Sequence, residues 1–374
     1  MTRSTLTERT LTSAAFAVSL AAFADAQEEI LFVADPGITA GYGTAVAGAG
    51  DVDGDGFPDL VVGHAPAAHG LESPVDRGGF HVVSGRTGAA LLSIEAKSAA
   101  EWVGYAVAGL GDVDGDGVPD VATGAPRTPA NGLGSGVVRI RSAATGVTSV
   151  LLVGAQPNDR FGWAVDVAGD VNNDGALDVI VGAPGVSTGP IEAGAATVHS
   201  GVDGAVLLAV SGTTPFAALG RAVAGVGDAD GDGVDDVAVG SPLDDTPGEN
   251  AGSVRVVSGS SGATLWTADG GPLSSLGWAL AAAGDVDQDG RPDLLVGEPG
   301  LSAAAPFSGA ARVLSGATGA IVRTFAAPVK WAGQGRRSRR RGTSTGTACR
   351  TSRSALRTRR RPTRAPARSG SGRG

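Results

Sequence analysis

Short apolar runs recur along the chain from about residue 28 onward, separated by turns rich in glycine and aspartate. Each unit has a stretch of the type GxAVAxxG, then an apolar run such as DLVVG or DVIVG, then two runs flanking SG-x-x-G, as in FHVVSGRTGAALLSI. Glycine in the last turn supplies the positive φ that a tight hairpin needs. No segment keeps the 3.6-residue apolar spacing of a helix. The pattern therefore predicts four short strands per unit and an all-β fold.

An acidic stretch of nine residues marks every unit and sets a nearly constant period. DVDGDGFPD begins at Asp51, and related stretches begin at Asp112, Asp170, Asp228 and Asp285, at intervals of 61, 58, 58 and 57 residues. Four-stranded units of this length arranged radially are the blades of a β-propeller. We therefore predict a β-propeller over residues 27–335, with five complete blades and an incomplete sixth. A stacked β-solenoid is the alternative, although its rungs are usually shorter.

Two glycines keep the same phase as the acidic stretches. One lies eight residues before the first aspartate and the other twelve residues after it, at Gly43 and Gly63, Gly104 and Gly124, Gly162 and Gly182, Gly220 and Gly240, and Gly277 and Gly297. The run EEILFVA, residues 28–34, resembles the fourth strand of a unit without the other three. In a closed propeller we expect such a strand to complete the last blade.

The acidic stretches have the composition of cation-binding loops. Alternate side chains of a tight loop converge, so positions 1, 3, 5 and 9 are predicted to offer side-chain oxygens and position 7 a backbone carbonyl. Calcium takes six to eight oxygens and removes the repulsion between such close carboxylates. Glycine at position 6 permits the sharp turn. The predicted calcium ligands of the five loops are Asp51, Asp53, Asp55, Phe57 and Asp59; Asp112, Asp114, Asp116, Val118 and Asp120; Asp170, Asn172, Asp174, Ala176 and Asp178; Asp228, Asp230, Asp232, Val234 and Asp236; and Asp285, Asp287, Asp289, Arg291 and Asp293.

An EF-hand, a magnesium site and a plain turn fit these acidic stretches less well than a calcium loop. An EF-hand needs a bidentate Glu at position 12 and flanking helices, but position 12 is Val or Thr inside an apolar run. Magnesium prefers strict octahedra that retain several waters. Aspartate and glycine also form plain turns, yet five copies in one phase argue against that alternative. Asn172 lowers the charge of the third loop, where we expect weaker calcium binding.

The formal charge of −9 divides into two unlike regions. Residues 336–374 hold 14 of the 29 basic side chains and no acidic one, so the remainder carries 38 acidic against 15 basic side chains. A body this acidic is a poor partner for nucleic acid or an anionic membrane. Bound cations would reduce its self-repulsion.

The N-terminus predicts export. Arg3 and Arg9 precede the apolar run LTSAAFAVSLAAFA and the small-x-small sequence that ends at Ala26, a pattern typical of a signal peptide over residues 1–26. We therefore expect a secreted or cell-surface protein after cleavage near Ala26. No later apolar run is long enough to predict a membrane span. The single cysteine, Cys349, lies in the basic region, so no disulfide can form within the body.

The stretches LGWALAAAGDVDQDGRPDLLVGEP and FGWAVDVAGDVNNDGALDVIVGAP resemble the FG-GAP repeat, which builds the propeller head of integrin α subunits and occurs in many bacterial extracellular proteins. The resemblance covers about residues 28–335. It implies calcium in the loop between the first two strands of each blade, held by the aspartates named above, and ligand binding elsewhere on the loop-bearing rim. The chain departs from integrin heads in having five complete units, no inserted ligand-binding domain and no leg domains.

Residues 336–374 interrupt the pattern with an arginine-rich tail. The next acidic stretch would begin near residue 342, and another reading frame of G/C-rich codons can encode it there. Our hypothesis is that a frameshift replaced a sixth blade, and that the tail is disordered. The nucleotide sequence decides this hypothesis.

Three functions remain open from the sequence. The first is a non-catalytic binding, adhesion or scaffold module for an extracellular protein or polysaccharide. The second is a polysaccharide lyase or glycosidase on a calcium-stabilised propeller, and the third is a purely structural part of a surface assembly. Tyr105, Trp163, Arg221 and Trp278 follow the pre-loop glycine and could bind a ligand, but we expect the tryptophans to pack between blades.

In an enzyme built from repeats, we expect one unit to carry a cluster of acidic, basic or metal-binding residues that the other units lack. The histidines gather only weakly in the first unit, where His64 and His69 flank the irregular sequence APAAHG, while His81 and His199 lie further along. We interpret this region as a solvated loop. No catalytic residues and no cofactor other than calcium are predicted.

Overall fold

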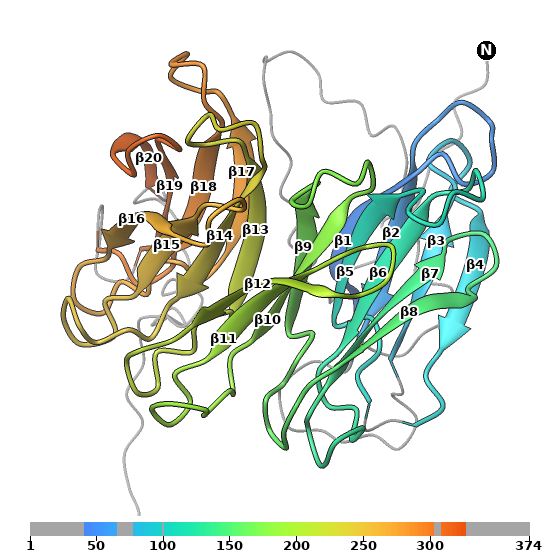
Figure 1. Ribbon diagram of the computed structural model, residues 1–374, viewed down its shortest axis with the longest axis horizontal. Coiled ribbons are helices and arrows are strands. Elements are labelled where there is room, and N and C mark those ends of the chain that lie inside the picture. Colours follow the sequence, from blue (N-terminus) through green and yellow to red (C-terminus); the bar gives the residue numbers. More distant parts are fainter. Residues whose placement is uncertain (1–40, 66–77, 99–100, 303–307, 327–374) are drawn as a thin grey trace, which may run out of the picture. The chain divides into compact units, whose positions relative to one another are not determined.

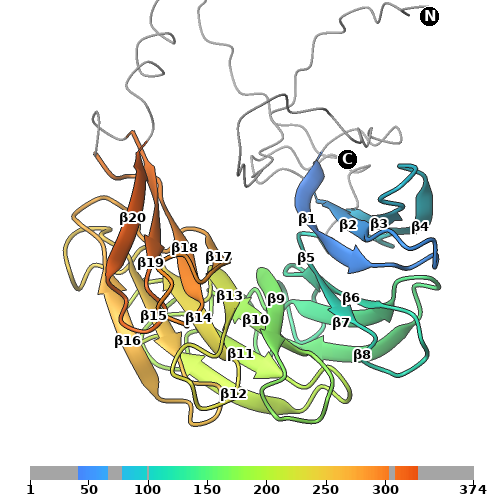
Figure 2. The same ribbon diagram turned by 90° about the horizontal axis from the view of Figure 1, so that it is seen from above.

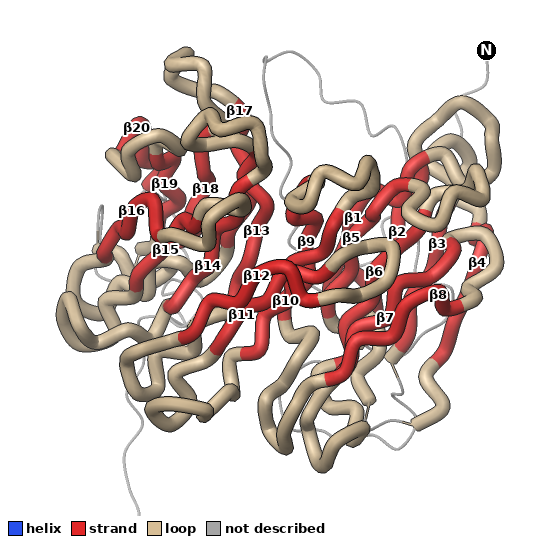
Figure 3. The backbone as a smooth tube through the Cα atoms, in the orientation of Figure 1, coloured by secondary structure: helices blue, strands red, loops and turns tan. Residues whose placement is uncertain are grey.

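The regular secondary structure of the described residues consists of strands (Figure 3). The computed structural model describes residues 41–65, 78–98, 101–302 and 308–326. Twenty strands form five antiparallel sheets of four. This confirms the all-β fold of four-stranded blades. The predicted signal peptide, the EEILFVA strand, His69, the sixth blade and the tail lie outside the described residues.

The strands follow one another within each blade. Blade 1 contains β1 (Tyr42–Gly50), β2 (Asp59–His64), β3 (Gly79–Val83) and β4 (Ala90–Glu95), and blade 2 contains β5 (Ala106–Gly111), β6 (Asp120–Ala125), β7 (Val137–Ser142) and β8 (Thr148–Val153). Blade 3 contains β9 (Ala164–Gly169), β10 (Asp178–Ala183), β11 (Ala195–His199) and β12 (Val206–Ser211), and blade 4 contains β13 (Ala222–Gly227), β14 (Asp236–Ser241), β15 (Ser253–Val257) and β16 (Thr264–Asp269). Blade 5 contains β17 (Leu280–Gly284), β18 (Asp293–Glu298), β19 (Ala310–Leu314) and β20 (Ile321–Ala326).

The blades stand side by side with their first strands innermost, as the ribbon views show (Figures 1 and 2). Contacts between neighbouring blades run from β1 to β5, then to β9, β13 and β17. In each blade, spatial order equals sequence order from the innermost to the outermost strand. This arrangement is that of propeller blades.

The hydrophobic core lies between blades rather than within one sheet. Four clusters of buried side chains each join two neighbouring blades. In one of them, Ile140 of β7 packs with Val179 and Val181 of β10. The second strand of a blade is covered on both faces, so β6, β10 and β14 are buried at every residue. The outermost strands, such as β8, instead alternate between exposed and buried positions.

The periodic glycines mark where the backbones of two blades meet. A Cβ atom on Gly182 of β10 would lie 1.9 Å from the carbonyl oxygen of Gly220, which precedes β13. Gly63, Gly124 and Gly240 face the next blade in the same way, at 2.0, 2.2 and 2.3 Å. Only glycine fits such a contact without moving the neighbour. At Gly297 of blade 5, a Cβ would meet nothing closer than Ala279 Cβ at 3.3 Å.

Candidate functional site

Each acidic loop connects the C-terminal end of an innermost strand to the second strand of the same blade. Its ninth residue is a fully buried aspartate: Asp59, Asp120, Asp178, Asp236 and Asp293 have 0% exposure. One carboxylate oxygen accepts the backbone N–H of loop position 2 in every blade, at 2.7–2.9 Å. These aspartates therefore anchor the loop to the blade besides being candidate ligands.

The second oxygen of the anchoring aspartate has a backbone donor in four blades. It accepts an N–H from the turn between the third and fourth strands, donated by Gly85, Gly201, Gly259 or Gly316 at 2.9–3.2 Å. Blade 2 has Ala143 in place of this glycine, and there Oδ1 of Asp120 is buried without a hydrogen-bond partner among the described residues. An unpaired buried carboxylate oxygen is the kind of atom that a bound cation satisfies.

Burial changes the acidity of the anchoring residues. It raises the pKa of the Asp120, Asp178 and Asp236 carboxyls above the ordinary value, while the backbone N–H groups that they accept act in the opposite direction. Neighbouring loop carboxylates add to the increase in pKa. A divalent cation would reverse this effect, because it favours the charged form.

The other loop carboxylates are held by backbone N–H groups of the loop itself. The first aspartate accepts the N–H of the glycine at position 6 in all five loops, at 2.8–3.1 Å. The aspartate at position 5 accepts the N–H of position 7, at 2.8–2.9 Å. The nine residues thus fold into a compact turn that directs several side-chain oxygens to one point.

The structure brings three carboxylates of four loops within 4.8 Å of one another. Positions 1, 3 and 9 converge in the loops of blades 1, 2 and 4, and positions 1, 3 and 5 converge in blade 5: these groups are Asp51, Asp53 and Asp59; Asp112, Asp114 and Asp120; Asp228, Asp230 and Asp236; and Asp285, Asp287 and Asp289. Such oxygen-only groups could hold a hard divalent cation. The ligand role of the remaining predicted residues, including the carbonyls at position 7, stays a prediction.

The third loop differs as the sequence indicated. Asn172 Nδ2 donates a hydrogen bond to Asp174 Oδ2 at 2.8 Å, and Asn172 Oδ1 accepts the backbone N–H of Asp174. An amide that donates to a neighbouring carboxylate already relieves part of the repulsion that a cation would remove. The prediction of weaker binding in this loop is therefore retained.

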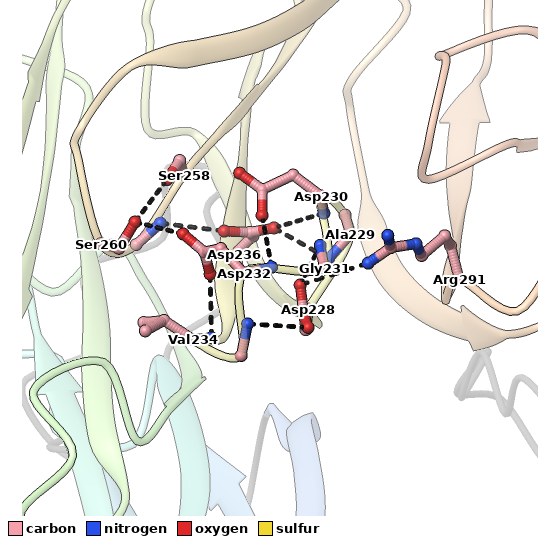
Figure 4. A network of polar contacts seen from close by, with 12 residues as sticks. Asp228, Ala229, Asp230, Gly231, Asp232, Val234, Asp236, Ser258, Ser260 and Arg291 are labelled. Carbon is pink, nitrogen blue, oxygen red and sulfur yellow. Dashed lines mark hydrogen bonds and ion pairs between the residues drawn. The ribbon is translucent and has the colours of Figure 1, made fainter.

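Adjacent loops also touch. In the second to fifth loops, the residue at position 8 lies over the glycine just before the preceding loop. A Cβ on Gly50 would meet Pro119 at 2.8 Å, and one on Gly227 would meet Pro292 at 3.1 Å. In addition, Arg291 Nη1 of the fifth loop lies 3.6 Å from Asp228 Oδ1 of the fourth loop (Figure 4). Ser260, from the turn after β15, donates to Asp232 in the same view.

The opposite ends of the innermost strands carry a ladder of aromatic and arginine side chains. Tyr105 stacks near Trp102 and Trp163, with ring centroids 5.6 and 4.7 Å apart. Arg221 lies 5.6 Å from the ring centroid of Trp163 and 4.0 Å from that of Trp278. The ladder therefore passes across blades 2, 3, 4 and 5, one residue after each pre-loop glycine.

Exposure varies along the ladder. Trp163 is half-buried, but Trp278 has 44% of its surface exposed. The expectation that the tryptophans pack between blades holds in part for Trp278, whose ring centroid lies 4.0 Å from the guanidinium of Arg221 in the neighbouring blade although nearly half of its surface is exposed. Sequence alone could not show this, because all four positions follow the same glycine.

The turn leading into the ladder has an uncommon backbone. Two residues before the pre-loop glycine, Trp102, Arg160, Ala218 and Ser275 have φ between 54° and 56°. This left-handed conformation is costly for residues with side chains. Because the turn recurs in four blades, it fixes the direction of the ladder residue that follows.

The interpretation of His64 as part of a solvated loop is wrong. His64 is the last residue of β2 and has 2% exposure, and His81 of β3 has 4%. Their rings stack at 5.0 Å, and Glu95 of β4 contacts His64. Sequence reasoning missed this group because its members belong to three strands and His81 lies two residues along β3 from the level at which His64 and Glu95 meet.

No helix among the residues that the structure describes is long and apolar enough to cross a membrane.

Comparison with known proteins gives a consistent family. The family model described as FG-GAP repeat matches residues 42–70, 103–140, 161–199, 219–257 and 276–314. The chain is 32% identical to integrin alpha-V of Gallus gallus over 223 residues, which is 54% of this chain and 20% of that protein. It is 30% identical to integrin alpha-8 of Homo sapiens over 224 residues (55% and 20%), and 32% identical to integrin alpha pat-2 of Caenorhabditis elegans over 228 residues (53% and 18%). The chain thus matches about a fifth of the length of these relatives.

Among solved structures, the crystal structure of the V. cholerae biofilm matrix protein Bap1 is similar at 19% sequence identity. The match has a TM-score of 0.43 and covers 78% of this chain and 40% of that one.

Proposed function

The chain belongs to the FG-GAP repeat family, and on that premise we propose that it is a secreted or cell-surface β-propeller that binds calcium in its five acidic loops and serves as a non-catalytic adhesion or scaffold module. Its ligand would be an extracellular protein or polysaccharide. The acidic loops would stabilise the blades, and the aromatic ladder at the opposite end would provide the binding surface.

The observation that supports calcium is the convergence of carboxylates without matching positive charge. Three carboxylates lie within 4.8 Å in four loops, and of the described basic side chains Arg291 alone forms an ion pair with a loop aspartate. Two like charges at 4 Å repel by about 1 kcal/mol in bulk water and more near a protein surface. A divalent cation would turn this repulsion into attraction. Calcium suits the site because it accepts irregular oxygen coordination.

An extracellular location would match this chemistry. Calcium sites of extracellular modules bind at about 10⁻⁴–10⁻³ M. Loops as exposed as these would fill outside the cell, where the body, which lacks cysteine, would rely on metal rather than disulfides.

The ladder supports a binding role. Tryptophan, tyrosine and arginine are the side chains that most often dominate binding energy at interfaces. Here they lie on one edge of four consecutive blades, and Trp278 exposes 44% of its surface.

Thermal unfolding of the full chain in calcium and in chelator tests the calcium part of the proposal. Each loop saturated at a hundredfold excess over Kd would add about 2.7 kcal/mol to the free energy of unfolding. We expect the melting temperature to rise strongly with calcium and much less with an equal concentration of magnesium. Asp287→Asn should reduce the rise, whereas Asp269→Asn, at the exposed end of β16, should not. An unchanged melting temperature in a folded protein would refute the calcium assignment.

A further inference from the structure

The first blade contains a cluster of two imidazoles and one carboxylate, contributed by β2, β3 and β4. His64, His81 and Glu95 each offer a ligand atom within 4.8 Å of those of the other two. His64 Nε2 lies 3.2 Å from Glu95 Oε2, and the two imidazole rings are stacked at 5.0 Å with 25° between their planes. The histidines are buried, and the Glu95 side chain is 56% exposed.

Strand register explains how these side chains meet. His64 of β2 pairs with Gly79 of β3, which in turn pairs with Glu95 of β4. A Cβ on Gly79 would lie 2.6 Å from Cε1 and 2.8 Å from Nε2 of His64. The absence of a side chain at Gly79 therefore leaves the room in which the His64 ring crosses β3 and reaches Glu95.

The same level of the other blades carries no comparable set. Three cross-strand partners occupy the level of His64, Gly79 and Glu95 in each other blade. From blade 2 to blade 5 they are Ala125, Val137 and Val153; Ala183, Ala195 and Ser211; Ser241, Ser253 and Asp269; and Glu298, Ala310 and Ala326. The position of His81 is taken by Arg139, Thr197, Arg255 and Arg312. In blade 5 the level holds an ion pair instead, with Arg312 Nε 2.9 Å from Glu298 Oε2. The scaffold does not require the histidine pair, since the other blades form without it.

We propose that His64, His81 and Glu95 form a binding site for a divalent transition-metal ion, of which Zn²⁺ is the representative. Imidazole nitrogen and carboxylate oxygen are ordinary zinc ligands, at about 2.0–2.2 Å. Two ligand atoms of a tetrahedral ion with such bonds lie about 3.3 Å apart, and the His64–Glu95 separation is 3.2 Å. The exposed side of Glu95 leaves room for water as the fourth ligand.

One further contact suits this site. His81 Nδ1 lies 2.8 Å from Ser93 Oγ, a contact that orients the ring, as outer partners of metal-bound histidines do, and leaves Nε2 as the ligand atom of His81.

The site and the acidic loops select different ions. Calcium and magnesium prefer oxygen ligands, and nitrogen ligands favour zinc and later transition metals. Zinc binding in blade 1 should therefore persist when the loops are saturated with calcium.

The test uses the full chain, freed of transition metals on a chelating resin and then saturated with calcium. Zinc is titrated by calorimetry, and Co²⁺ is added separately as a reporter, because nitrogen ligation changes its visible absorption. We expect one Zn²⁺ per chain. His64→Ala should weaken binding at least 100-fold, and Ser93→Ala, a positioning change, should weaken it about 10- to 100-fold.

Matched variants keep the result interpretable. Alanine is the natural residue at the position of His64 in blades 2 and 3, so His64→Ala is compatible with the fold. His199→Gln removes a buried histidine outside the cluster and should leave zinc affinity unchanged. A calcium-dependent melting temperature in each variant shows that it is folded and tests the proposed function separately. Equal zinc affinity in His64→Ala and the parent, displacement of zinc by calcium, or no zinc uptake by the folded parent would each overturn the site.

Discussion

The two ends of the innermost strands differ in what is repeated. At the C-terminal ends, five loops share the same buried aspartate and the same hydrogen bonds to position 2 and position 6. At the N-terminal ends, the turn is shared but the side chain that follows the glycine is Tyr105, Trp163, Arg221 or Trp278. The residues are the same in all blades where their side chains must accept hydrogen bonds from backbone N–H groups. Side chains vary where they are partly exposed, and differences among them there would allow a specific ligand to be recognised.

The largest effect should come from removing an anchoring aspartate. Asp236→Ala would leave the N–H groups of Ala229, Asp230 and Gly259 without their acceptor. Each buried unpaired donor costs about 1–3 kcal/mol, so we expect the free energy of unfolding to fall by about 3 kcal/mol or more even in chelator.

Urea unfolding measures this change. Asp232→Ala in the same loop is the control, since its carboxylate is exposed and should matter little without calcium. Equal losses in the two variants would mean that the loop end has no special anchor.

Glycine at the contact between blades gives the second effect. Gly182→Ala would push a methyl group against the Gly220 carbonyl oxygen, 1.9 Å away, and should cost about 1–3 kcal/mol. Gly297→Ala, at the same position of blade 5, has space and should change stability by less than about 1 kcal/mol. Thermal melting compares them, and an equally stable pair would contradict the close approach of the blades.

A charged residue between the two ends gives a pH-dependent effect. Asp166 of β9 is paired with Ile180 at a level where the other innermost strands have Ala47, Ala108, Ala224 and Ala281. Burial raises its pKa from 3.8 to about 6, although the carboxylate accepts backbone N–H groups of Val167 and Gly225.

Because the raised pKa means that the native state prefers the proton, Asp166 lowers stability as pH rises from about 4 to above 6. The shift corresponds to a change of about 3 kcal/mol in the stability of Asp166→Ala relative to the parent between pH 4 and above pH 6. The loss of the two hydrogen bonds should make the variant less stable than the parent by about 1–2 kcal/mol below pH 4 and should leave it more stable by about 1–2 kcal/mol above pH 6. Unfolding measured across this range should show the two stability curves crossing. A constant difference between them would contradict the raised pKa.

The smallest effect on stability should accompany the largest effect on binding. Trp278→Ala removes an exposed ring and one contact with Arg221, so stability should fall by less than about 1 kcal/mol. Binding to an extracellular ligand, screened with immobilised glycans and matrix proteins, should weaken at least tenfold. Ile321→Ala, exposed on β20, should not affect it. Ligand binding that survives Trp278→Ala would place the binding surface elsewhere.

The sequence predicted most of the fold because the period, the acidic loops and the glycines are all local signals. Two features of the sites could be found only in the three-dimensional structure. Asp59 was predicted as one of five ligands, but one of its carboxylate oxygens also accepts the N–H of Gly85, which lies 26 residues further on in another turn. The pairing of His64 with Gly79 and Glu95 depends on the register of three strands. Spacing within one stretch contains no information about either contact.

Each of the last four acidic loops contacts the loop before it, so the edge that carries these loops is a one-dimensional series of nearest neighbours. Pro119 rests over Gly50 and Pro292 over Gly227, so a change in one turn is felt first by the turns it touches. A loop that loses its ion should lower the affinity of the adjacent loops and leave those two blades away unchanged. Calcium uptake would then spread along the edge by propagation from occupied loops, instead of following five independent equilibria.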